Sequence, residues 1–165
     1  MSFAIRAFQL DELSHITRLA HEIWPHTFAE ILSPKQIDYM LEWMYSPSTL
    51  RDQFQNGHMF YGIEIEGEWV GFMGLEAKYP QDDSIKIHKL YVLPELQGKG
   101  IGRRLIDYAI DSAKMGGYNQ LILNVNRFNK AVRFYEHLGF SILKQEDISI
   151  GDGYLMEDYV MVLAV

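Results

Sequence analysis

Hydrophobic and polar positions along the chain follow strand-like and helix-like periods in turn. Apolar residues recur at every second position in some segments and at every third or fourth position in others. This pattern predicts strands over 3–8, 58–65, 68–77, 90–93, 121–125, 141–150 and 155–163. It predicts a first helix that Asp11 caps and Pro25 stops. Further helices are predicted from Ser33 to Met44, from about Ser48 to Gly57, over 101–113 and over 131–138. The chain therefore mixes helices and strands, without an internal repeat.

Local signals indicate where several of these elements begin and end. Ser33-Pro34-Lys35-Gln36 predicts a capping box at a helix start, with serine as the cap, glutamine as its reciprocal partner and proline at the first helical position. Glu66-Gly67 joins two strands into an antiparallel hairpin. Gly71 and Gly74 inside the second of these strands indicate a bulge or a close backbone approach. Gly116-Gly117 ends the helix over 101–113.

A glycine-rich turn between a strand and a helix is the clearest candidate site. The strand over 90–93 stops at Pro94, and Gln97-Gly98-Lys99-Gly100-Ile101-Gly102 leads into the next helix. The free N–H groups of a first helical turn and the helix dipole together favour an anion. Glycines let such a ligand approach the backbone closely, because no Cβ stands in the way. The turn therefore predicts a ligand that carries phosphate.

The spacing of this turn excludes two common phosphate motifs. A P-loop requires serine or threonine after its lysine, whereas Gly100 follows Lys99 here. A dinucleotide fingerprint requires GxGxxG and an acidic residue about 20 positions later, whereas the chain has GxGxG followed by Tyr118-Asn119-Gln120 in that region. The remaining pattern is QxxGxG, formed by Gln97, Gly100 and Gly102 directly after a strand that reads LYVLP.

A second motif follows the helix. The strand over 121–125 is followed by Asn129 and then by a short helix that reads AxxFYxxxGF, from Ala131 to Phe140. These two motifs, in this order, closely resemble the GNAT acetyltransferase superfamily. The region from His26 to Met40 and the C-terminal segments also resemble the PaiA-like branch of bacterial spermidine/spermine N-acetyltransferases.

The resemblance implies the fold and the reaction. It implies a single domain over 1–165 with an α/β (α+β) GNAT fold, in the order β-α-α-β-β-β-α-β-α-β-β. Its central sheet would be mixed and mostly antiparallel, with about seven strands flanked by helices. The superfamily transfers an acetyl group from acetyl-CoA to an amine by direct attack. A homodimer formed through the C-terminal strands is compatible with this interpretation.

The resemblance also implies which residues bind acetyl-CoA. The strand over 90–92 would splay from the strand over 121–125, so that backbone groups of Leu90, Tyr91 and Val92 bind the pantetheine and one amide polarises the thioester carbonyl. Asn129 would cap the following helix and face the cofactor. The pyrophosphate would lie on the turn and the start of the next helix, formed by Gln97, Gly98, Lys99, Gly100, Ile101 and Gly102, with Lys99, Arg103 or Arg104 near the phosphates.

Two residues are candidates for proton transfer. Tyr135 matches the family tyrosine that protonates the departing thiolate, and a phenol with a pKa of about 10 can serve as a general acid at neutral pH. The alternative is that Tyr135 is an ordinary core aromatic on the same helix, without a role in proton transfer. His88 is the candidate general base. The polyamine branch tends to carry carboxylates at the positions of Lys86 and His88, so this lysine makes a polyamine acceptor less secure.

Composition narrows the function classes. The chain has 165 residues, no cysteine and a net charge of −7. The absence of cysteine excludes disulfides, thiolate metal sites and a cysteine nucleophile. The charge argues against nucleic acid and is compatible with a cationic acceptor. The six histidines form no recognisable metal motif, so no metal is predicted.

The N-terminus lacks a leader pattern, and no stretch is apolar for long enough to span a bilayer, so a cytoplasmic protein without membrane contact is expected. The predicted acceptor is a small-molecule primary amine, with a polyamine as one candidate. Two alternatives stay open, namely acetylation of a protein N-terminus or lysine, and a non-catalytic sensor of acyl-CoA. Trp24 and Trp43 could wall off a small-molecule site beside the first two helices, which favours the first prediction.

Overall fold

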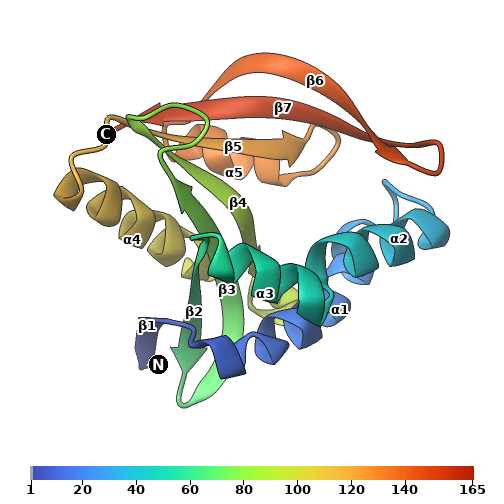
Figure 1. Cartoon of the computed structure of the whole chain (residues 1–165), viewed down its shortest axis with the longest axis horizontal. Coiled ribbons are helices and arrows are strands. Elements are labelled where there is room, and N and C mark those ends of the chain that lie inside the picture. The colour runs from blue at the N-terminus through green and yellow to red at the C-terminus, as the bar shows by residue number, and fades with distance from the viewer. Residues whose placement is uncertain (1) are drawn as a thin grey trace.

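A seven-stranded sheet forms the centre of the molecule, with the strand order β1-β2-β3-β4-β5-β7-β6 (Figure 1). The computed structural model describes residues 2–165. The strands are β1 (Phe3–Ala7), β2 (Met59–Ile65), β3 (Glu68–Ala77), β4 (Ser84–Val92), β5 (Gln120–Asn126), β6 (Ser141–Gly151) and β7 (Tyr154–Ala164). The helices are α1 (Ser14–Thr27), α2 (Pro34–Tyr45), α3 (Pro47–Gln55), α4 (Ile101–Met115) and α5 (Ala131–His137), with short 3₁₀ turns at Leu10–Glu12 and Pro94–Leu96.

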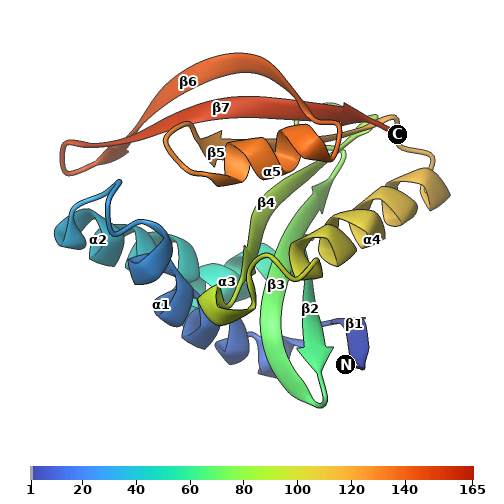
Figure 2. The same cartoon turned by 180° about the vertical axis from the view of Figure 1, so that it is seen from behind.

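The sheet divides at its centre. All neighbouring strands pair antiparallel except β4 and β5, which pair parallel. That parallel pairing covers only Ser84–Ile87 against 120–123, and within the described chain it goes no further. The rest of β4 diverges from β5, so the two halves of the sheet form a V that is visible from both sides (Figures 1 and 2). The predicted splay of these strands is confirmed.

Helices cover both faces of the sheet and bury two separate cores. The first three helices pack on one face, where α3 lies in front in Figure 1, and α4 and α5 pack on the other, which is nearer the viewer in Figure 2. The core under α4 includes Ile87, Leu105 and Leu123, and the core under α1 to α3 includes Trp24 and Phe72. No helix in the described part of the chain has the length and apolarity that a bilayer crossing requires.

A bulge in β4 changes the direction in which its side chains point. Gly74 of β3 lies opposite Lys89, but the next β3 residue lies opposite Ile87, so His88 is an extra residue. Side chains normally alternate between the two faces of a strand. Here Ile87 before the bulge and Leu90 after it both reach the core under α4. Lys89 consequently turns toward α3 on the opposite face.

The fold predicted from sequence is confirmed, with local corrections at two helix ends. Three helices precede β2, whereas the element order implied by the family resemblance has two. The third, α3, is the short helix that the residue pattern predicted near Ser48. Asp11 does not cap α1, because it belongs to a 3₁₀ turn that Gln9 caps. Pro25 does not stop α1, which continues to Thr27. Proline removes one hydrogen bond here, but the site is exposed and in the last turn, where water can satisfy the freed carbonyl.

Two other local predictions are confirmed, one of them in part. The Ser33 hydroxyl accepts a hydrogen bond from the backbone N–H of Gln36 at 3.1 Å, and Pro34 is the first residue of α2. The Gln36 side chain does not complete a capping box, because it donates to the carbonyl of Leu155 instead. Gly71 allows close backbone approach, since an added Cβ would lie 2.9 Å from the carbonyl oxygen of Tyr91.

Candidate active site

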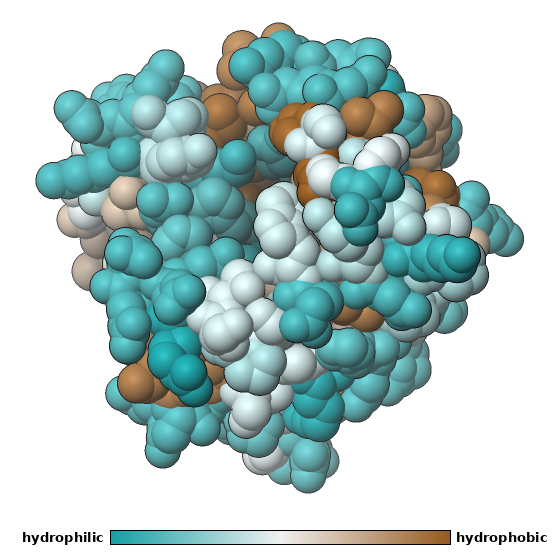
Figure 3. Space-filling model, turned by 45° about the vertical axis from the view of Figure 1, so that its right-hand side comes forward, coloured by the Kyte–Doolittle hydropathy of each residue, from teal (hydrophilic) through white to brown (hydrophobic). Residues whose placement is uncertain are grey.

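A cavity of about 950 Å³ lies where the two halves of the sheet separate. Its walls come from α1 to α3 on one side, from β4 and β5 at the back, and from α4 and α5 on the other side. Figure 3, in which the right-hand side of Figure 1 comes forward, shows hydrophobic atoms in a hollow between mostly hydrophilic surfaces. Every residue predicted to bind or catalyse lines this cavity except Lys99 and Arg104.

The glycine-rich turn presents unpaired backbone N–H groups to the cavity. Gly98 and Gly100 both have φ of +79°, a left-handed conformation that other residues adopt at a cost. Gly100 is the N-cap of α4, so the N–H groups of the first turn have no partner inside the helix. An added Cβ at Gly98 or Gly100 would meet no atom within 4 Å, so the space beside the backbone is open. This cradle fits a pyrophosphate group.

The basic residues near this turn separate into different roles. Arg103 lines the cavity from the first turn of α4. Arg104 does not line it, because its guanidinium packs over the ring of Phe3 at 4.1 Å. Lys99 is exposed outside the cavity, and its contact with a phosphate stays a prediction.

The free edge of β4 faces the gap between the sheet halves. Past Ile87, the β5-facing edge of this strand, including Leu90 and Val92, has no strand partner among residues 2–165. Such an edge can bind an extended chain through backbone hydrogen bonds. On the other side of the gap, the Asn129 side chain lines the cavity and accepts a hydrogen bond from the N–H of Ala131 at 3.0 Å. It thus binds the first N–H of α5 from one residue before the N-cap, Lys130.

Tyr135 occupies a site that suits both of the roles considered for it. Its ring packs against Phe134 and Phe140, with centroids 5.2 and 5.5 Å away, and it belongs to the core under α4. The residue also lines the cavity. Burial raises the pKa of the hydroxyl above its ordinary value, which keeps the phenol protonated at neutral pH. A protonated phenol beside the cavity is chemically able to donate a proton.

His88 lines the cavity and is oriented by a carboxylate. Its Nε2 lies 2.8 Å from Oε1 of Glu76, a half-buried residue on β3. Burial is the largest cause that lowers the pKa of His88, to about 4, and the Glu76 contact opposes this shift. The ring is therefore neutral at neutral pH, and a neutral imidazole that donates Nε2–H to a carboxylate leaves Nδ1 free to accept a proton.

His58 brings a third ligand-type side chain to this cluster. The nitrogen and oxygen atoms of His58, Glu76 and His88 all lie within 4.8 Å of one another, although the sequence shows no metal motif. The two imidazole rings stack, with centroids 4.9 Å apart and planes 17° apart. Their in-plane lone pairs therefore lie in nearly parallel planes and do not converge on one ion without rotation of a ring. The arrangement fits a hydrogen-bonded cluster better than a metal site.

The buried imidazole of His88 predicts an acid-sensitive fold. The pKa of His88 is about 4 in the folded protein and about 6.5 in an unfolded chain, so between these values only the unfolded chain binds this proton. The free energy of unfolding should fall by about 2–3 kcal/mol as pH drops through this window. Urea unfolding at pH 7 and pH 4.5 should show a smaller fall for His88→Asn than for the wild type. Equal falls would contradict the assignment.

Two buried charged residues at the cavity are not among the predicted site residues. Lys89 and Asp158 are each 3% exposed, and both line the cavity. Asp158 interrupts an otherwise apolar face of β7, and the same face carries Met156 and Val160, so the alternation in the sequence contains this signal. Burial raises the pKa of Asp158, while a hydrogen bond from Asn124 opposes the shift.

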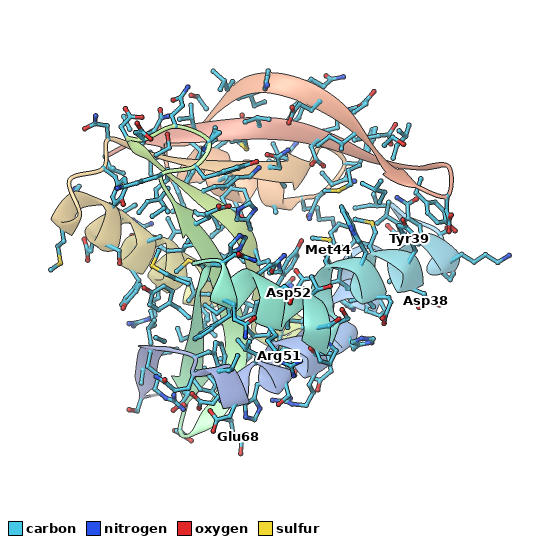
Figure 4. All side chains as sticks on the ribbon, viewed as in Figure 1. Asp38, Tyr39, Met44, Arg51, Asp52 and Glu68 are labelled. Atoms are coloured by element: carbon cyan, nitrogen blue, oxygen red, sulfur yellow. The ribbon has the colours of Figure 1, made fainter. Side chains whose placement is uncertain are left out.

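One end of the cavity is bridged by contacts between α2 and the β6–β7 hairpin. The Tyr39 hydroxyl donates to the carbonyl of Ile150 at 2.6 Å, and its ring lies 5.2 Å from that of Tyr154. Figure 4 shows Tyr39 and Met44 on the side of α2 that faces the hairpin. Trp24 is buried in the wall as expected, whereas Trp43 lines the cavity but is 48% exposed. The cavity is therefore partly enclosed beside α1 and α2, the side where the sequence predicts the acceptor (the acceptor side).

Comparison with known proteins agrees with this geometry. The sequence model of the Acetyltransferase (GNAT) family matches residues 16–140, which include both motifs and the strands that splay. The chain belongs to the GNAT family. Its resemblance to the PaiA-like branch is confirmed by a spermidine N(1)-acetyltransferase from Thermoplasma acidophilum, which is 29% identical over 163 residues, or 95% of this chain and 97% of that protein.

Two further relatives define how far the GNAT similarity reaches. The crystal structure of PaiA N-acetyltransferase from T. acidophilum in complex with coenzyme A superposes with a TM-score of 0.83 at 26% identity, over the full length of both chains. An uncharacterised N-acetyltransferase, YjgM from Escherichia coli, is 36% identical over 88 residues, which are 52% of this chain and 53% of that protein. The chain thus spans about half the length of this curated GNAT relative.

Proposed function

We propose that the protein transfers an acetyl group from acetyl-CoA to a primary amine of a small molecule. The observation that carries the proposal is the single cavity that joins an anion cradle, a free β4 edge, a buried tyrosine and a neutral histidine. The PaiA relative was crystallised with coenzyme A, and this chain has open space and unpaired N–H groups at its glycine turn. This cradle supports acetyl-CoA as the acetyl donor.

In this proposal, backbone groups perform most of the donor-side work. The N–H groups from Gly98 to Gly102 bind the pyrophosphate, with Arg103 beside it, whereas the Gln97 N–H already donates to the carbonyl of Pro94 at 3.2 Å. Asn129 faces the cofactor from the start of α5. The free edge at Leu90, Tyr91 and Val92 holds the pantetheine and directs one amide at the thioester carbonyl, where negative charge develops. Acetyl-CoA supplies the activated acetyl group. Tyr135 donates a proton to the departing sulfur.

His88 is the proposed general base on the acceptor side. Glu76 fixes the imidazole by accepting from Nε2, which leaves Nδ1 to take a proton from the attacking amine. The neutral ring can accept this proton at neutral pH. Its lowered pKa makes His88 a weaker base than free histidine. It therefore contributes most after the amine has begun to bond to the carbonyl carbon, because the nitrogen then carries positive charge and loses its proton readily.

A small molecule suits the acceptor side better than a folded protein. The bridge between α2 and the β6–β7 hairpin covers one end of the cavity, and the Trp24 and Phe28 side chains are buried in its wall. A protein N-terminus or lysine would require a more open groove for the flanking residues. The spermidine acetyltransferase relative makes a polyamine the first candidate to compare with other amines.

The proposal is tested by thiol release from acetyl-CoA with spermidine, spermine, aminoglycosides, amino acids and short peptides. The wild type should turn over one class of small amine and show little activity on peptides. His88→Asn should lower kcat at neutral pH by about 100-fold, the lower range for general base catalysis. The loss should shrink as pH rises, because more of the amine is then deprotonated in solution.

Two outcomes would contradict this proposal. Tight coenzyme A binding by calorimetry without turnover on any amine would favour a non-catalytic acyl-CoA sensor. Selective turnover of peptides would favour protein acetylation. If His88→Asn loses the same factor at every pH, the histidine supports the structure of the site and does not act as the base.

A further inference from the structure

Lys89 is a buried cation without an anionic partner. It follows the His88 bulge in β4, is 3% exposed, and turns toward α3. Its Nζ donates to the side-chain oxygen of Gln53 at 2.9 Å. The rings of Tyr45 and Phe60 lie 5.3 and 5.9 Å from the nitrogen. These contacts are all to uncharged groups.

The charge balance around Lys89 is incomplete. An ammonium group has three N–H donors, and one of them is used by Gln53. No carboxylate oxygen among residues 2–165 lies within 4.0 Å of this nitrogen. Burial alone lowers the pKa of Lys89, to about 8, so the group still carries its charge at neutral pH. A buried charge without a partner is unfavourable, and an anion that entered the site would relieve this cost.

The cavity gives such an anion access to Lys89. Lys89 and Gln53 both line it, and Lys86 lines the same wall from β4. Nearby, Trp24 Nε1 and Thr27 Oγ1 are buried and have no hydrogen-bond partner among the described residues. Asp158 is the one carboxylate among the described residues that line the cavity. The part of the wall around Lys89 therefore offers several hydrogen-bond donors and no contacting carboxylate within residues 2–165, whereas Glu76, Glu146 and Asp158 lie near Lys86.

We propose that the acetyl acceptor carries a carboxylate as well as an amine, and that Lys89 binds this carboxylate. The inference rests on the proposed acetyl transfer and narrows its acceptor class to amino acids and related amino carboxylates. A polyamine would bring further positive charge to a wall that already holds Lys86 and Lys89. The methionine and aromatic side chains in the same wall suit an acceptor with an apolar portion, and these are Trp24, Phe28, Met40 and Met44.

Matched acceptors test this inference directly. L-methionine and L-methioninamide differ only in the carboxylate, as do 4-aminobutyrate and butylamine, and phosphoethanolamine tests whether a phosphate replaces the carboxylate. The wild type should have a kcat/KM at least tenfold higher for one acid than for its partner without the carboxylate, and higher than for spermidine. Lys89→Met should remove this preference mainly through KM. Lys86→Met, on the same strand and wall, should retain it.

Direct binding separates this inference from the proposed reaction. N-acetyl-L-methionine and N-acetyl-L-methioninamide, titrated into protein saturated with coenzyme A, require no turnover. Tighter binding of the acid by the wild type and not by Lys89→Met supports the carboxylate site, even if no amine is acetylated. Preference for spermidine or phosphoethanolamine, or equal effects of Lys89→Met on acid and amide, would overturn it. Thermal unfolding of both variants verifies that they fold.

Discussion

Replacing Tyr135 with phenylalanine is expected to lower kcat by about 100- to 10,000-fold while coenzyme A binds as before. The range is that of a lost general acid, and it corresponds to about 3–5 kcal/mol in the activation barrier. The ring packs against Phe134 and Phe140, and phenylalanine keeps these contacts. The change therefore removes only the hydroxyl, whose pKa burial raises. Steady-state thiol release and calorimetry with coenzyme A measure the two effects separately.

Tyr108→Phe is a suitable control for this experiment. Tyr108 lies on α4, packs against Tyr61 with ring centroids 5.0 Å apart, and does not line the cavity. The control should keep kcat within about twofold, since the altered hydroxyl is remote from the reacting groups. If Tyr135→Phe also retains full turnover, the residue is a core aromatic and the sulfur takes its proton from another donor.

Replacing Gly100 with valine should weaken coenzyme A binding at least about tenfold, or about 1.4 kcal/mol. Gly100 has φ of +79° at the N-cap of α4, where a β-branched residue is strained. Valine relieves this strain by moving the backbone, and the N–H groups that form the anion cradle then change direction. Calorimetric titration with coenzyme A measures the loss.

Gly117→Val isolates the effect on the ligand from the effect on stability. Gly117 follows the other end of α4 with φ of +77°, and an added Cβ at either glycine meets no atom within 4 Å. Both variants should lose similar thermal stability, because the backbone strain is alike. Coenzyme A should bind normally to Gly117→Val. Equal losses of affinity in the two variants would show that strain in α4, and not the cradle, controls binding.

The arrangement of elements was predictable because each strand and helix carries its own apolar period. The strand over 121–125 and the helix over 101–113 depend on local sequence and appear close to their expected bounds as β5 and α4. Helix ends were less predictable, since Pro25 can remain in a last turn that is open to solvent. A proline signals a lost hydrogen bond, and only the surrounding structure decides whether water replaces it.

The donor side of the site was more predictable than the acceptor side. The positions of Gly98, Gly100 and Asn129 follow from backbone geometry that short motifs encode, and all three residues line the cavity. Glu76 and His58 reach His88 from neighbouring strands, so their contact depends on the register of the sheet, which one sequence does not determine. Lys89 was missed for a related reason, because an ordinary alternating strand would place it on the other face.

The His88 bulge decides which face of β4 each later side chain occupies. Because one extra residue separates two stretches of opposite phase, Ile87 and Leu90 face the same core although three positions divide them. Deleting His88 would restore simple alternation with Lys89 and Tyr91 still on the α1–α3 side, so that change would remove only the imidazole and its contact with Glu76. Straightening the strand with all its residues kept would instead exchange the faces of every residue after His88. The bulge therefore lets one strand present both a histidine and a lysine to the same side of the sheet.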